Sequence, residues 1–169
     1  PKCPDGWYRV EPRGYVCVGS MATLDLHHPV VIASARRPRL DDLPYPYVLS
    51  RSPPPMLYAR LPGHRDQIRF EQDLEKHASN VTMGAPSPGD DPIPAWLLPG
   101  QPSLSLGNLW HAPDRVLLGQ ARARSGFALL SMFSDNARRF GVTTGLEVIP
   151  LDRVHLVKPS TFAGIALHD

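Results

Sequence analysis

The chain has 169 residues, of which 42% are hydrophobic and 20% charged, a composition typical of a globular domain. Its formal net charge of +2 is too small to predict a nucleic-acid partner, and no apolar run approaches the roughly 20 residues of a membrane span. The 20 prolines and 13 glycines argue against a helix bundle and favour short strands joined by long loops. Because the chain begins with Pro1, we expect a processed or excised piece of a longer protein, with any export signal lost upstream.

A β-hairpin is predicted at residues 7–18, where two runs rich in β-forming residues flank a proline-glycine turn at 12–14. The simplest register places Arg9 opposite Cys17 and puts Trp7 and Cys17 on the same face. Both faces of this hairpin are largely apolar. We therefore expect it to be buried inside a small barrel or sandwich.

The two cysteines, Cys3 and Cys17, favour a disulfide that closes a 15-residue loop. In an oxidising compartment such a bridge contributes about 3 kcal/mol by restricting the unfolded chain. It requires Pro4-Asp5-Gly6 to turn the N-terminus back over the hairpin. The alternative is two free thiols, with Cys17 packed as a small hydrophobe.

Next along the chain, Val30-Val31-Ile32 predicts a short buried strand or loop base within residues 29–35. Residues 47–51 and 56–61 predict two strands that form a second hairpin-like pair across the prolines at 53–55. The strongest helix pattern covers residues 64–80, with one apolar stripe made of Phe70, Leu74, His77, Ala78 and Val81.

Residues 84–106 are rich in proline and predict a linker. Part of this linker should pack on a neighbouring surface through Ile93, Trp96, Leu97 and Leu98. Residues 107–169 then predict a second small β module, or the other half of a sheet shared with residues 1–83, with strands at 115–118, 126–133, 139–144, 146–149 and 154–157.

Charged and catalytic motifs are sparse. The arginine clusters at 36–39, 122–124 and 138–139 could touch an anionic polymer, but solvated loop charge is the favoured interpretation. Phosphate-binding glycine motifs and metal-binding spacings are absent from the sequence, so we expect no cofactor and no metal site. A small hydrolase built on Asp25, His27 and His28 is a remote alternative, because a nucleophile is missing beside them.

Several segments of the chain together resemble a known region of bacterial cell-wall proteins. They are Gly-Trp-Tyr-Arg-Val-Glu-Pro-Arg-Gly-Tyr-Val-Cys-Val-Gly at 6–19, Thr-Leu-Asp at 23–25, Leu-Pro-Tyr-Pro-Tyr-Val at 43–48, Tyr-Ala-Arg-Leu-Pro at 58–62, Arg-Phe-Gly-Val-Thr-Thr at 139–144 and Val-Ile-Pro-Leu-Asp-Arg-Val at 148–154. This set is similar to the region upstream of the catalytic domain in L,D-transpeptidase-family proteins of myxobacteria and their relatives. The resemblance covers most of the chain.

The composition and patterns above predict a mainly β fold with one amphipathic helix, an α+β class of small barrels with long proline-rich loops. The resemblance implies that these barrels are SH3-like. It also implies an exported module in the cell envelope or periplasm, whose partner is peptidoglycan or an attached catalytic domain. The family's catalytic cysteine stands in a Ser/Thr-x-Gly-Cys-x-Arg-like context, which neither Cys3 nor Cys17 has. We therefore expect no catalytic residue in this chain and place any active site of the parent protein after Asp169.

Six aromatic residues are the candidate ligand-binding residues of such a module, because some lie beside prolines and could line a wet cleft: Trp7, Tyr8, Tyr15, Tyr45, Tyr47 and Tyr58. The favoured function is a non-catalytic module that positions or regulates a cell-wall enzyme or binds peptidoglycan. The alternative is a structural spacer without a ligand, which packs on the next domain.

Overall fold

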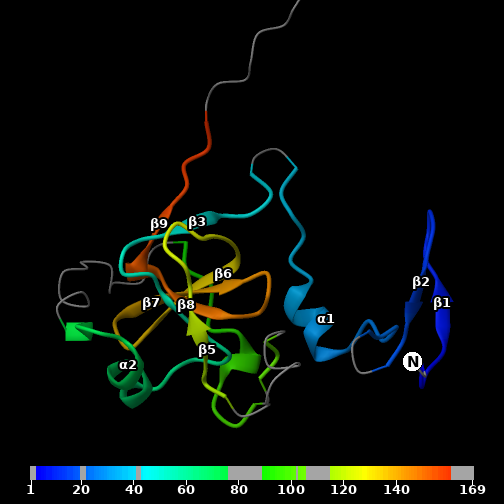
Figure 1. The fold of residues 1–169 in the computed structure, drawn as a ribbon, viewed down its shortest axis with the longest axis horizontal. Coiled ribbons are helices and arrows are strands. Elements are labelled where there is room, and N and C mark those ends of the chain that lie inside the picture. Colours follow the sequence, from blue (N-terminus) through cyan, green and yellow to red (C-terminus); the bar gives the residue numbers. More distant parts are fainter. Residues whose placement is uncertain are drawn as a thin grey trace, which may run out of the picture.

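The computed structural model describes residues 3–19, 22–40, 43–75, 89–101, 103–105 and 115–160. These residues form mainly β structure with two short α-helices, so the predicted β-rich fold is confirmed (Figure 1). A two-stranded sheet pairs β1 (Trp7–Arg9) with β2 (Tyr15–Cys17). A seven-stranded antiparallel sheet has the order β5-β4-β8-β7-β6-β3-β9, with β3 at Tyr47–Ser50, β4 at Met56–Tyr58, β5 at Leu117–Gln120, β6 at Gly126–Asp135, β7 at Arg138–Thr143, β8 at Val148–Pro150 and β9 at Val154–Leu156.

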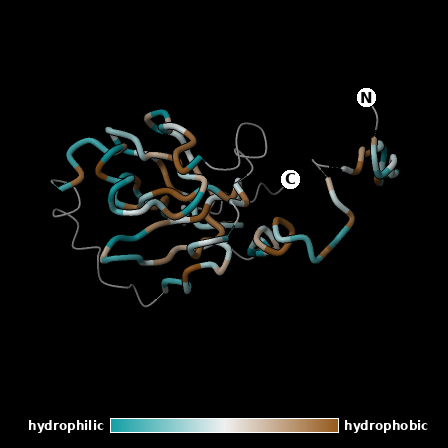
Figure 2. The backbone as a smooth tube through the Cα atoms, turned by 90° about the horizontal axis from the view of Figure 1, so that it is seen from below, coloured by the Kyte–Doolittle hydropathy of each residue, from teal (hydrophilic) through white to brown (hydrophobic). Residues whose placement is uncertain are grey.

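The centre of the large sheet is the meander β6-β7-β8, whose apolar residues alternate between two faces, with a register shift between Leu129 and Ser131 that displaces the alternation within β6. One face carries a cluster that includes Phe133, Phe140 and Val148, and the other carries Leu129 and Ile149. In Figure 2, hydrophobic and hydrophilic stretches alternate along the backbone of the main body. The end strands β5 and β9 do not pair with each other, so the described strands form an open sheet and not a closed barrel.

The strands at 47–50 and 56–58 form where they were expected, but they do not pair with each other. Strand β3 lies between β6 and β9, while β4 lies between β5 and β8. Three consecutive prolines at 53–55 separate the two strands, and prolines lack the N–H groups and the free φ that a tight hairpin turn uses. The prediction of a second hairpin at this position is therefore wrong.

The apolar run after His28 is a helix and not a strand. Helix α1 (Pro29–Ser34) begins with a proline at its first position, and the Nδ1 atom of His28 accepts a hydrogen bond from the Val30 N–H at 3.3 Å. Val30 and Ala33 pack against the large core cluster, while Ile32 stays exposed. Proline and a capping side chain thus decide the conformation of this short run, although its β-branched residues favour a strand.

Helix α2 (His64–Phe70) begins at the predicted residue, but residues 71–73 interrupt the predicted helix before helical backbone resumes at residues 74–75. Glu71 leaves the helix with φ −104° and ψ 119°, and Asp73 has a positive φ of 54°. The departure takes the Glu71 carboxylate into the protein interior, where it meets two partners described below. The residues predicted as the last helical turns, 76–80, lie outside the described residues.

The proline-rich segment packs on this chain's own sheet. The short 3-10 helix η1 (Ala95–Leu97) buries Leu97 against the large core cluster, and Ile93 and Trp96 pack there in part. The Asp91 N–H donates a hydrogen bond of 2.7 Å to the Met132 carbonyl and so ties the segment to β6. Residues 84–88 and 106–114 lie outside the described part of the chain.

The strands beyond this segment lie close to their predicted positions, and the same sheet takes β3 and β4 from before the segment and β5 to β9 from after it. A second 3-10 helix, η2 (Leu151–Arg153), joins β8 to β9. Neither described helix has the length and apolarity that crossing a membrane requires.

Candidate functional site

The N-terminal hairpin is an exposed aromatic surface. Its register is Trp7↔Cys17, Tyr8↔Val16 and Arg9↔Tyr15, which is two residues from the predicted one. A shift of two leaves every side chain on its predicted face, because side chains alternate with a period of two. Trp7, Arg9 and Tyr15 therefore share one face, the aromatic hairpin face, on which Trp7 is 58% and Tyr15 69% exposed.

The predicted burial of this hairpin is wrong. In Figure 1 it lies at one end of the molecule, apart from the large sheet, and its two strands pair only with each other. Isolated two-stranded hairpins are marginally stable in water, so this one needs another stabilising contact.

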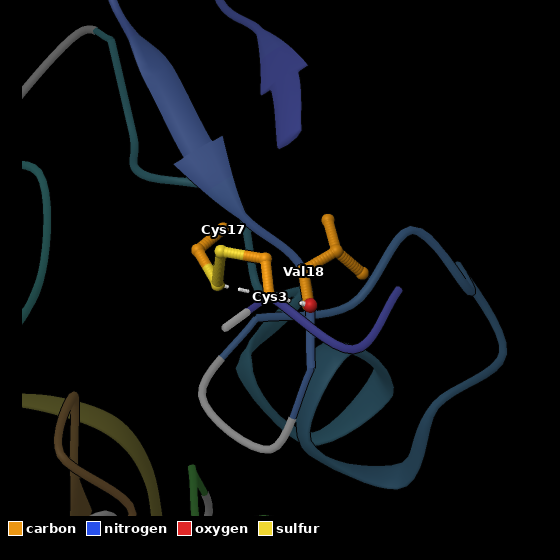
Figure 3. Close-up of a disulfide and its surroundings, with 3 residues drawn as sticks. All are labelled: Cys3, Cys17 and Val18. Carbon is orange, nitrogen blue, oxygen red and sulfur yellow. Dashed lines mark hydrogen bonds between the residues drawn. A yellow bond between two sulfur atoms is a disulfide. The ribbon is translucent and has the colours of Figure 1, made fainter. Parts of the chain in front are cut away.

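That contact is the disulfide between Cys3 and Cys17, with a Cα–Cα distance of 5.4 Å (Figure 3). The predicted turn at residues 4–6 is present, since the Gly6 N–H donates to the Cys3 carbonyl at 3.3 Å. The Val18 N–H donates to the Gly6 carbonyl at 3.0 Å, and the Asp5 N–H donates to the Val18 carbonyl. These bonds continue the pairing of β1 with β2 beyond Trp7 and Cys17, and the disulfide ties the turn at residues 4–6 to the end of β2.

The other three aromatic candidates lie in the main body of the protein. Tyr58 is fully buried, and its hydroxyl donates a hydrogen bond of 2.8 Å to a Glu71 carboxylate oxygen. Tyr45 packs against the core and donates to the Arg36 carbonyl, while Tyr47 is a half-buried residue of β3. The structure therefore brings Trp7, Tyr8 and Tyr15 together on one hairpin and leaves the six aromatic residues without a common groove.

A cleft of about 500 Å³ opens in the main body of the protein. Its apolar lining comes mainly from the proline-rich segment, with Ile93, Trp96 and Leu98. Its polar groups come from other elements: Arg60 follows β4, Asp66 lies in the first turn of α2, Asp135 ends β6, and Asn136 begins the turn between β6 and β7. The volume lies within the range of small-ligand and peptide pockets.

A buried ionic network joins two walls of this cleft. Arg138, at the start of β7, donates to Glu71 at 2.7 Å, to Asp152 at 3.0 Å and to the Gln67 side-chain oxygen at 2.7 Å. The side chains of Glu71 and Asp152 are each only 3% exposed. Arg138 therefore fixes the β6–β7 turn against α2 from behind the cleft.

The network also sets the ionisation of its members. Burial alone would lower the pKa of Arg138, but hydrogen bonds and the charges of Glu71 and Asp152 outweigh it and raise that pKa. Burial, helped by the neighbouring Glu71 charge, raises the pKa of Tyr58 far above its ordinary range. Arg138 stays charged and Tyr58 stays neutral at physiological pH.

Sequence reasoning missed this network because it placed the arginines at 138–139 in solvent. Arg138 is buried, and Arg139 pairs with Asp90. A signal for its burial was present in the sequence: residues 136–137 can form a two-residue turn, and Arg138 then begins a strand inside the sheet. Its acidic partners are far from it in the sequence, and only the fold brings them together.

Asp25, His27 and His28 have local structural roles. An Asp25 carboxylate oxygen accepts from the His27 N–H at 2.9 Å, and the His28 ring caps α1. All three residues are exposed. Within the described ranges, no group of three or more histidine, cysteine, aspartate or glutamate side chains is arranged to hold a metal ion.

The comparisons with known protein families, with curated proteins and with solved structures found no match to this chain. The structure and its chemistry therefore carry the functional argument.

Proposed function

We propose that this chain is a non-catalytic, exported module of an L,D-transpeptidase-like cell-envelope protein, and that it binds peptidoglycan through the aromatic hairpin face. In this proposal it positions or regulates a catalytic domain located elsewhere in the parent protein. The observation that carries the proposal is the disulfide-tied hairpin that leaves Trp7 and Tyr15 exposed on one face. The SH3-like character of the module belongs to the same proposal, and the antiparallel β6-β7-β8 meander is compatible with it.

The disulfide supports the exported location. Disulfides form and persist in oxidising compartments such as the periplasm, and they are rare in the reducing cytosol. The Cys3–Cys17 bridge also gives the hairpin a fixed shape without help from the main body. A rigid, exposed hairpin loses little conformational entropy on binding, which favours a recognition role.

The exposed aromatic rings support a ligand with both apolar and polar surface. Rings such as those of Trp7 and Tyr15 offer a flat apolar face together with a polar N–H or O–H group. Diagonal cross-strand neighbours are separated by roughly 7–8 Å. Sugar rings and short peptides both present alternating apolar and polar groups at that scale, and peptidoglycan contains both.

Retention on purified sacculi tests this proposal. We expect the wild-type chain to be retained and the Trp7→Ala/Tyr15→Ala variant to be lost from the pellet, because both rings leave the aromatic hairpin face. Tyr8→Ala is the matched control, since Tyr8 lies on the opposite face of the same hairpin. Equal retention of all three proteins, or no retention of the wild type, would refute binding through this face.

A structural scaffold is the second candidate function. Large apolar side chains stay exposed on and before α1, with Leu26 77% and Ile32 60% exposed, and a neighbouring domain could cover them. In that case the excised chain is folded and does not bind sacculi, while the parent protein loses thermal stability when this region is removed. A parent protein that keeps its unfolding temperature after the deletion would contradict the scaffold function.

A further inference from the structure

We propose that the cleft between α2, η1 and the β6–β7 turn binds an extended peptide segment that presents an apolar side chain next to a lysine or arginine. This site is separate from the aromatic hairpin face and does not depend on the function proposed for it.

The apolar part of the inference rests on the apolar lining of the cleft. Trp96 and Ile93 are only partly covered by the core on which they pack, and Leu98 is 48% exposed at the rim. Prolines 62 and 99 also line the cleft. Aromatic-lined grooves are the kind of surface on which proline-rich extended peptides dock, because a polyproline II segment is already ordered before it binds.

The basic part of the inference rests on charge. Asp66 and Asp135 both line the cleft and are half-buried. The described residues include no lysine or arginine that pairs with either carboxylate, and Asp135 accepts only from the neighbouring Asn136 amide, at 2.9 Å. Arg60 is the one cation in the lining, so the acidic groups exceed the basic ones. A cationic ligand group gains charge-assisted hydrogen bonds that this cleft does not satisfy internally.

A lysine or arginine side chain combines the two requirements. Its methylene stem can lie along apolar surface such as Trp96, while its charged end reaches a carboxylate at the edge of that surface. The cleft volume of about 500 Å³ holds this side chain together with an adjoining apolar one. Arg138 keeps α2 and the β6–β7 turn at a fixed separation, so the two carboxylates are held in place before a ligand arrives.

Titration of the ¹⁵N-labelled chain with a short peptide amide tests the inference. The probe alternates leucine and proline and carries one arginine; the comparison peptide has glutamate in place of arginine. We expect the arginine peptide to shift the amide resonances of Leu98 and Asn136 and the glutamate peptide to leave them unchanged. No shift at millimolar peptide, or shifts confined to residues outside the cleft, would overturn the proposal.

Charge variants then test the recognition chemistry. Asp66→Asn/Asp135→Asn should weaken binding of the arginine peptide about tenfold or more, because hydrogen bonds to charged groups are lost. Asp5→Asn/Asp25→Asn is the control, since it makes the same change in net charge at exposed sites outside the lining. Equal weakening by both variants would assign the effect to overall charge and overturn the proposal.

A second copy of the chain is the competing occupant, and sedimentation velocity detects it. A monomer at the concentrations used for the titration supports a separate peptide ligand. A dimer that Asp66→Asn/Asp135→Asn dissociates would overturn the proposal and assign the cleft to self-association.

Discussion

Replacing Arg138 with methionine should be among the most destabilising single changes in this chain. The guanidinium contacts both oxygens of Glu71, both oxygens of Asp152 and the side chain of Gln67, at 2.7–3.1 Å. Methionine matches the arginine side chain in length only as far as Nε, and so keeps the apolar contacts of the stem without the guanidinium. The substitution leaves the carboxylates of Glu71 and Asp152, whose side chains are each only 3% exposed, without the cation that they share.

The magnitude follows from the cost of an uncompensated buried charge. Removing one partner of a buried ion pair costs about 3–5 kcal/mol, because the remaining charge has lost both its solvent and its partner. A domain has a total stability of about 5–15 kcal/mol, so this loss is a large fraction of it. We expect the urea midpoint of Arg138→Met to fall accordingly, or the variant to be unfolded at room temperature.

Two further variants separate the charge effect from a packing defect. Arg138→Met/Glu71→Gln/Asp152→Asn removes the orphaned charges and should recover most of the loss. Arg9→Met is the control, because the Arg9–Glu11 pair is largely exposed and such pairs contribute about 0.5 kcal/mol or less after solvent screening. A loss below about 1 kcal/mol for Arg138→Met, or a triple variant no more stable than the single one, would refute this account.

Three other predictions follow from single contacts. Reducing the Cys3–Cys17 bridge should lower the local stability of the hairpin by about 3 kcal/mol and speed amide exchange at Val18, and unchanged exchange would contradict the role of the bridge. Ala137 has a positive φ of 61° in the two-residue β6–β7 turn, so Ala137→Gly should raise the free energy of unfolding by about 0.5–1 kcal/mol. A lower urea midpoint for this variant would count against the strain argument. The raised pKa keeps Tyr58 neutral in the folded state, whereas in the unfolded chain the tyrosine loses its proton above about pH 10. The free energy of unfolding should therefore fall by about 1.4 kcal/mol per pH unit above that pH. Tyr58→Phe should flatten this slope, and an unchanged slope would assign the alkaline loss to other groups.

The local elements were largely readable from the sequence. Alternating apolar residues located the strands around 126–133 and 139–144, and proline and glycine marked most of the ends. The spacing of Cys3 and Cys17 with the turn at 4–6 favoured the disulfide over two free thiols, and the structure contains the disulfide. These features depend on neighbours within a few residues, which is why the sequence alone reveals them.

Three local predictions failed because a longer-range contact or a competing local signal decided the outcome. Glu71 leaves its helix for a buried arginine 67 residues further along the chain, and helix periodicity contains no information about that partner. The run at 30–32 became a helix because Pro29 and His28 satisfy its first turn. The hairpin at 7–18 was expected to be buried because both faces are apolar, yet its disulfide gives it a stability that burial would otherwise have to supply.

The sequence by itself determined the β-rich composition, most strand positions, the disulfide and the two-sided character of the aromatic hairpin. Only the tertiary structure decided that β3 and β4 have different partners, that Tyr58 is a core residue and that Trp96 lines a cleft with Asp66 and Asp135. The physical reason is distance along the chain. Strand and turn preferences are set by adjacent residues, whereas the cleft and the Arg138 network are assembled from segments that meet only after the sheet has formed.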